Sequence, residues 1–216
     1  VSVIVLTPAT ATALTTVANV RSDLGLAEGM PPDAQITRFI KQASSRVATY
    51  CRRAFGRQTV RQRFSGCRGV VDVGGGLLLD RSPVVQILGV TADGVELAPD
   101  AFEADDRFLY ALHSGDRTPW TARSVVVDYE AGWLLPSETR GDPAATAAAD
   151  LPDDVERAVI QLVGVAVSIA GRDAMVKSES TEGVGSVDWY VQGSTASLPH
   201  PEAEAALRDY RRVLFA

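Results

Sequence analysis

The chain has 216 residues, of which 46% are hydrophobic, so it can bury a core as one large domain or two small ones. Its 27 acidic and 21 basic residues give a formal net charge of −6, which argues against a general nucleic-acid binder, because neutralising phosphates requires clustered Lys and Arg. Cys51 and Cys67 suggest neither a disulfide framework nor a cysteine-based zinc site, and a reducing cytoplasm fits them best. The apolar residues 1–6 are too short to span a membrane and lack the basic lead-in of a signal peptide, so we expect no membrane partner.

Two helices are predicted before residue 57. Thr16 can cap a short helix that ends at Gly25, and its apolar face is formed by Val17, Val20 and Leu24. A longer helix begins at Pro32-Asp33 and ends at Phe55-Gly56. Its apolar positions are Ile36, Phe39, Ile40, Ala43, Val47, Tyr50, Cys51 and Ala54. The opposite face is basic, and we expect it to be solvated or to meet an acidic neighbour; it carries Arg38, Lys41, Arg46, Arg52 and Arg53.

From residue 57 to Trp133 the hydrophobic period changes to two, which indicates strands. Asp93-Gly94 between two apolar runs is typical of a β-hairpin turn. The connections are too short for parallel crossovers, so we expect an antiparallel section of roughly six to eight short strands. The predicted strands cover residues 60–64, 70–73, 77–79, 84–90, 95–97, 102–104, 108–112 and 124–129.

The remaining third of the chain is predicted to be helical again. Residues 135–150 are rich in Pro, Ala, Gly and Thr and read as a surface loop. Pro152 and Asp153-Asp154 begin a helix that is apolar nearly all round and ends at Gly171, and a final helix begins near Pro201.

These elements predict an α+β fold, a bundle of about four helices with an inserted antiparallel β domain. The expected parts are an N-terminal helical part over residues 1–56, a β insertion over 57–134, the surface loop over 135–150, and a C-terminal helical part over 151–216 that completes the bundle and contains a mobile loop over 172–197.

No motif carries a strong catalytic, cofactor or metal signal. Gly74-Gly75-Gly76 is followed by a strand pattern and not by the Lys and helix of a phosphate loop. His113 and His200 lack metal-ligand spacing, and His113-Ser114-Gly115-Asp116 lacks a nucleophile elbow. Neighbouring carboxylates such as Asp105-Asp106 point to opposite faces of a strand. We therefore expect no enzyme and no cofactor, and a small hydrolase using Asp105 or His113 stays as an alternative.

Two segments have the residue types of partner surfaces. Leu214 and Phe215 are apolar residues at the chain end, where order is usually poor unless another element covers it. Trp189 and Tyr190 follow a Gly/Ser-rich stretch and are either an interface pair or loop anchors. Both features favour an interaction protein over a reaction centre.

Several passages resemble one family through their order and spacing, although none is specific alone. They are residues 14–25, 36–55, 81–87 with the Asp93-Gly94 turn, 125–132, 151–152 and 178–187, which together extend over nearly the whole chain. In this order they resemble the head-to-tail adaptor (connector) proteins of long-tailed bacteriophages and of the phage-like gene transfer agents of alphaproteobacteria. The strand-rich insertion resembles that of the longer members, which add a β domain to the helices.

The resemblance implies a structural ring, usually twelvefold, in the neck of a virion or gene transfer agent particle assembled in the bacterial cytoplasm. Its implied partners are the portal protein, neighbouring copies of itself, a tail stopper or terminator protein, and DNA that passes through the channel without sequence-specific binding. The implied portal contacts are Leu207, Tyr210, Arg211, Leu214 and Phe215, and the implied subunit or channel loop contains Glu179, Glu182, Trp189 and Tyr190. A tail-side completion or stopper protein is the alternative within the same class.

Overall fold

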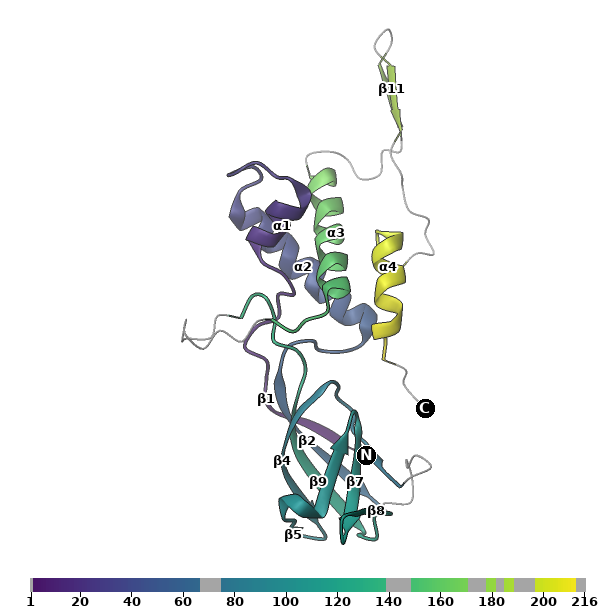
Figure 1. Cartoon of the computed structure of the whole chain (residues 1–216). Helices are drawn as coiled ribbons and strands as arrows, with labels where there is room; N and C mark the ends of the chain where they lie inside the picture. The colour runs from purple at the N-terminus through teal and green to yellow at the C-terminus, as the bar shows by residue number, and fades with distance from the viewer. Residues whose placement is uncertain are drawn as a thin grey trace. The chain divides into compact units, whose positions relative to one another are not determined.

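The computed structural model describes residues 2–66, 75–138, 149–170, 178–181, 185–188 and 197–212. In this part the chain is a mixed α+β protein with four α-helices and antiparallel sheets, as predicted (Figure 1). It divides into a sheet unit, Val1–Thr10 with Gly56–Leu134, and a helical unit, Ala11–Phe55 with Leu135–Ala216. The first ten residues therefore belong with the sheet, whereas the sequence placed them with the helices. Across the described residues, no helix has the length and apolar character needed to cross a membrane.

The first two helices begin where the sequence predicted. Helix α1 spans Val17–Leu24; the Thr16 hydroxyl accepts a hydrogen bond from the Asn19 N–H, and Gly25 ends the helix in the left-handed conformation with φ 60°. Helix α2 spans Asp33–Cys51, so the predicted end at Phe55 is wrong. Arg52 adopts φ 54° and turns the chain away. Phe55 is buried outside the helix.

The second half of the helical unit contains α3, Asp153–Ile169, and α4, Pro201–Leu207, which continues as the 3-10 turn η2, Arg208–Tyr210. His200, which lacks metal-ligand spacing in the sequence, caps α4 because its Nδ1 accepts from the Ala203 N–H at 3.3 Å. Between the helices, the backbones of β10, Ser178–Thr181, and β11, Gly185–Asp188, pair antiparallel within the span predicted as a mobile loop.

Helix α3 connects the two sequence segments of the helical unit. The carboxylate of Glu156 accepts hydrogen bonds from the Thr15 hydroxyl and the Asn19 side-chain amide, both at 2.7 Å. The buried face of α3 covers its first three turns and ends at Val163, whereas the sequence predicted burial nearly all round. The apolar residues of its last two turns, such as Val165 and Ile169, remain half-buried.

The sheet unit contains a five-stranded antiparallel sheet in the order β1-β2-β9-β4-β5. Its strands are β1 Ser2–Thr7, β2 Gln58–Ser65, β9 Ser124–Ala131, β4 Val84–Ala92 and β5 Val95–Glu96. The smaller sheet contains β3 Leu77–Leu78, β7 Phe108–His113, β6 Phe102–Asp105 and β8 Asp116–Thr118, and the 3-10 turn η1, Pro99–Ala101, precedes β6. Strands β1 and β8 were not predicted, and the strand expected over residues 70–73 lies outside the described residues.

The turn between β4 and β5 confirms the predicted hairpin. Asp93 and Gly94 both have positive φ, 47° and 87°, and Ala92 pairs with Val95. This is the geometry that a two-residue turn needs to follow the twist of its strands. The Asp93 carboxylate also accepts from the Ser124 N–H at 2.8 Å and so attaches the turn to β9.

A buried polar network holds β3 and the segment after it against β2 and β9. The Tyr129 hydroxyl, on β9, donates to Oε1 of Gln62 at 2.8 Å, and the same oxygen accepts from the Asp80 N–H at 2.8 Å. Gln62 also donates to the Leu78 carbonyl, while the Arg81 N–H donates to Tyr129. Burial raises the pKa of Tyr129 to about 12, so the hydroxyl keeps its proton for donation.

Replacing Gln62 should destabilise the sheet unit more than replacing Tyr129. Gln62→Leu leaves the Asp80 N–H and the Tyr129 hydroxyl without their acceptor, at roughly 1–3 kcal/mol for each buried orphaned group. Tyr129→Phe orphans only the Arg81 N–H and should cost about 1 kcal/mol. Urea unfolding would measure both, with the exposed neighbour substitution Arg63→Gln as a control expected within about 0.5 kcal/mol. Equal costs for all three would contradict the network.

Candidate interaction surface

A groove of about 1410 Å³ lies on the helical unit, and we call it the α2–α3 groove. Helix α2 provides one wall, the last two turns of α3 provide the other, and residues 197–199 and Arg211 complete it. Its apolar lining includes Phe39, Ala43, Leu162, Val165, Ile169 and Leu198. Of these, Phe39, Val165 and Ile169 are only half-buried, so apolar surface faces the groove.

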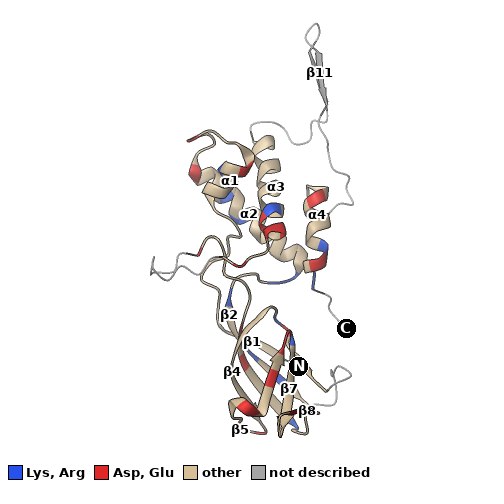
Figure 2. Ribbon diagram, viewed as in Figure 1, with Lys and Arg blue, Asp and Glu red and all other residues tan. Residues whose placement is uncertain are grey.

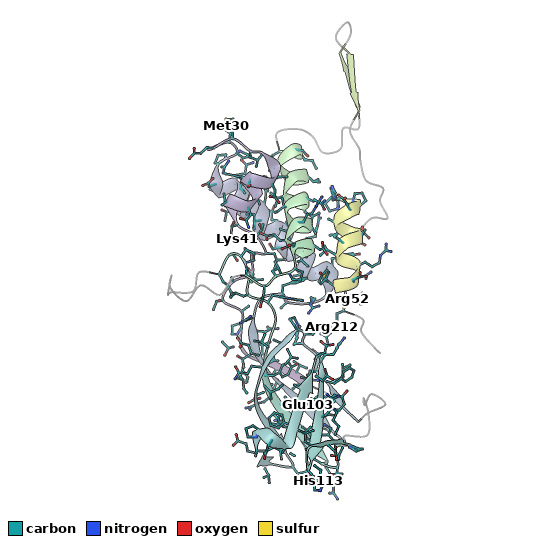
Figure 3. The ribbon with its side chains drawn as sticks, in the orientation of Figure 1. Met30, Lys41, Arg52, Glu103, His113 and Arg212 are labelled. Carbon is teal, nitrogen blue, oxygen red and sulfur yellow. The ribbon has the colours of Figure 1, made fainter. Side chains whose placement is uncertain are left out.

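The rim of the α2–α3 groove is basic. The lining contains the cations Arg38, Lys41, Arg46, Arg52 and Arg211, and none of the described residues that line it is Asp or Glu. In the described parts of the chain, the first four of these cations form no ion pair with a carboxylate. Lys41 and Arg52, from the middle of α2 and from its C-terminal cap, are labelled in Figure 3.

Aromatic rings support two of the cations. The Arg211 guanidinium lies 4.9 Å from the centroid of the Tyr50 ring, and that of Arg38 lies 5.7 Å from the Phe39 ring. The Tyr50 hydroxyl donates to the Glu204 carbonyl at 3.4 Å, and the Arg212 N–H donates to the Cys51 carbonyl at 2.9 Å. The end of the described chain is thereby attached to the C-terminal end of α2.

The periodicity of α2 explains half of this surface. Ile36, Ile40 and Val47 are buried on one face of the helix, which turns the basic positions outward. From the sequence, we expect this basic face to be solvated or to meet an acidic neighbour. In the structure, four of the five basic residues on this face line the groove. The apolar wall on α3 was missed, because an all-round apolar pattern does not show which turns remain uncovered.

The five predicted portal contacts have different environments. Leu207 is fully buried, at 0% exposure, so its assignment to a partner surface is corrected: it belongs to the core of the helical unit. Tyr210 is half-buried, and burial raises its pKa, with the nearby carboxylate of Asp154 as the second cause. Arg211 is exposed and stacks on Tyr50. Leu214 and Phe215 lie outside the described residues.

The predicted subunit or channel loop is described only in part. Glu179 lies on β10, where the backbone alone is described. Glu182, Trp189 and Tyr190 lie outside the described residues. The contacts of these four residues therefore stay predictions.

The residues considered for catalysis have structural roles. Asp105 pairs with Arg117 at 3.0 Å, and Glu103 pairs with the same guanidinium at 2.8 Å, which lowers the pKa of Glu103. Figure 2 shows where acidic and basic residues lie along the ribbon of the chain. His113 is exposed at the end of β7, and the next two residues, with φ 54° and 87°, form the turn to β8. Among the described residues no group of three His, Cys, Asp or Glu side chains could hold a metal ion.

Two further motifs are explained by packing. A Cβ atom at Gly76 would lie 2.7 Å from the Tyr110 ring, so this glycine allows close contact with β7. Gly74 lies outside the described residues. Trp120 packs against the sheet core and donates from Nε1 to the Leu109 carbonyl at 2.9 Å, the arrangement of an anchored core residue.

No protein-family model and no curated protein matches the sequence. Solved structures do match its fold over the full length. A chain in the neck of a native GTA particle, computed with twelvefold symmetry, has a TM-score of 0.53 and 18% identity, with 100% of this chain and 98% of that chain covered. A chain in the neck of an empty GTA particle, computed with sixfold symmetry, has a TM-score of 0.53, 20% identity and the same coverage.

A chain from the virion of a native gene transfer agent particle has a TM-score of 0.52 and 19% identity, again with 100% and 98% of the two chains covered. At these identities the likeness is one of fold. Because the matches cover the whole chain, its fold is similar to that of these chains over both units, in agreement with the resemblance found in the sequence.

Replacing Leu207 by Ala should destabilise the helical unit by roughly 2–5 kcal/mol, because it removes a fully buried side chain and leaves a cavity. Arg211→Ala should cost only about 0.5–1 kcal/mol, since it removes an exposed cation–π contact. Urea unfolding of both variants would test this difference. If the Leu207→Ala variant were as stable as the parent chain, Leu207 would not be a core residue and would again be a candidate for contact with a partner.

Proposed function

We propose that this protein is a structural neck component of a phage or gene transfer agent particle, without catalytic activity. In this role it forms a ring beneath the portal, connects the head to the tail, and lets DNA pass through its centre. The observation that carries the proposal is the full-length fold match to chains of gene transfer agent necks. The symmetries of those two necks, twelvefold and sixfold, support a ring, and we propose twelve copies.

The exposed surface of the chain supports an assembly role. A closed ring needs two different patches on each subunit that are complementary to each other, because its contacts are heterologous. Strand β1 is at the edge of its sheet and carries Ile4, Val5 and Leu6 with 56%, 43% and 46% exposure. An exposed apolar edge strand is prone to pair with another chain, so β1 suits a permanent contact with a neighbouring copy.

Each part of the chain can be assigned one of the contacts that a ring in the neck needs. We assign the ring body to the helical unit, viewed as a bundle into which the β domain is inserted. Portal contact is assigned to the chain end through Tyr210, Arg211, Leu214 and Phe215, and Leu207 acts from the core by fixing α4. The loop with Glu179, Glu182, Trp189 and Tyr190 is assigned to a neighbouring copy or to the channel wall, where acidic residues would repel DNA.

Electron microscopy of particles that contain this protein, with light scattering on the purified chain, tests the proposal. We expect a ring at the portal vertex, whether or not the free chain is a monomer. A ring in contact with the tail tube and not with the portal would instead identify a tail-side completion or stopper protein. Absence from all particles, with a stable monomer in solution, would reject a structural role and favour the hydrolase alternative.

A chain that ends at Arg212 should fold normally but fail to join the portal. It keeps the Arg212 N–H to Cys51 hydrogen bond and the stacking of Arg211 on Tyr50, while it lacks Leu214 and Phe215. The expected result is an unchanged urea midpoint and loss of binding to purified portal. As a matched control, a chain of full length with Gly and Ser at positions 213–216 should behave like the truncation. Normal portal binding by either variant would rule out a portal contact through Leu214 and Phe215.

A further inference from the structure

We infer that the α2–α3 groove binds an acidic amphipathic helix of a partner protein. The inference rests on the charge, the apolar lining and the length of the groove, and it does not depend on the proposed ring. It assigns a ligand chemistry to a surface that has no part in the portal contact proposed above, apart from Arg211 at its end.

The charge of the groove is opposite to that of the whole chain. The protein has a formal net charge of −6, yet among the described residues five cations and no carboxylate line this groove. Solvated faces of surface helices normally carry both signs, often as pairs three or four residues apart. The only acidic residue of α2 is Asp33 in its first turn, which pairs with Arg21 at 2.6 Å and does not line the groove. The field of the groove therefore attracts an anionic ligand.

The apolar lining distinguishes between anionic ligands. Phe39, Val165 and Ile169 are half-buried and line the groove together with the cations. Covering such surface contributes about 25 cal/mol for each Å² removed from water, which a ligand with an apolar face obtains. A nucleic acid backbone presents phosphates to the cations but no apolar face to this lining. The combination favours a protein segment with apolar residues on one face and carboxylates beside them.

The length of the groove fits a helix of about four turns. From Arg38 to Arg52 the helical rise corresponds to about 21 Å, at about 1.5 Å for each residue. A ligand helix of about 14 residues has the same length, and carboxylates spaced along it can face the cations at both ends of α2. An amphipathic helix in a groove between two helices is an established mode of peptide recognition.

Selection from a random display library of helix-favouring peptides on the full chain tests the inference. A variant with Arg38→Glu and Arg46→Glu serves for counter-selection, since both positions are exposed and their change should not unfold the protein. The enriched peptides should carry Asp or Glu together with apolar residues at spacings of three and four. In fluorescence anisotropy, we expect the double variant to bind the best peptide at least about tenfold more weakly, equivalent to about 1.4 kcal/mol.

Matched variants separate the groove from general charge. Arg157→Glu with Arg208→Glu changes the same number of exposed arginines outside the groove and should leave peptide affinity within about twofold. Ile169→Ser should weaken binding without changing charge. Enrichment of basic or neutral peptides, equal loss in both double variants, or no charge-dependent enrichment would overturn the inference.

Two other occupants are tested in the same series. If a labelled single- or double-stranded oligonucleotide bound more tightly than any enriched peptide and lost affinity in the Arg38→Glu, Arg46→Glu variant, the groove would be a nucleic-acid site. If light scattering showed self-association that this variant abolished, the occupant would be a second copy. Either result would replace the acidic helix proposed here.

Discussion

The helical unit depends on α3 meeting residues that lie more than a hundred positions away in the chain. Glu156 accepts hydrogen bonds from Thr15 and Asn19, at sequence separations of 141 and 137. A second such contact joins the C-terminal end of α2 to α4. The Cys51 thiol donates to the Leu207 carbonyl, at a sequence separation of 156. Such contacts close long loops, so their entropy cost must be offset by the apolar burial of α3, where Val155, Val159 and Val163 are fully buried.

This closure also determines what the molecule leaves exposed. The first three turns of α3 are buried in the helical core, so its last two turns, together with the outer face of α2, form the α2–α3 groove. The sheet unit closes in a comparable way, because β1 pairs with β2 from more than fifty positions away and becomes an edge strand with exposed apolar residues. In each unit, the long-range contact that completes the core also creates a surface suited to a partner, which is what a subunit of an assembly requires.

Local features of the structure could be predicted from the sequence because their physics involves only neighbouring residues. Thr16 and Gly25 define α1 by satisfying the backbone groups at its two ends. Asp93-Gly94 specifies the β4–β5 turn through its tolerance of positive φ. The period of the apolar residues gave α2, α3 and most strands, and the order of these elements suggested the particle-neck architecture that the fold comparison supports. The basic half of the candidate groove was visible in the same way, as one face of α2.

Other features needed the tertiary structure, because helical and strand periodicity identify an apolar face without saying what covers it. Leu207 and Tyr210 are both portal contacts implied by the resemblance, yet Leu207 is in the core and Tyr210 is half-buried. Residues 2–7 and the C-terminal turns of α3 are apolar in sequence, and only their packing shows that residues 2–7 are largely exposed and that the apolar residues of these α3 turns are half-buried. The sequence by itself therefore determined the elements and their order, where local backbone and capping chemistry suffices. The tertiary structure decided which apolar residues are left for partners, since that depends on contacts between distant segments.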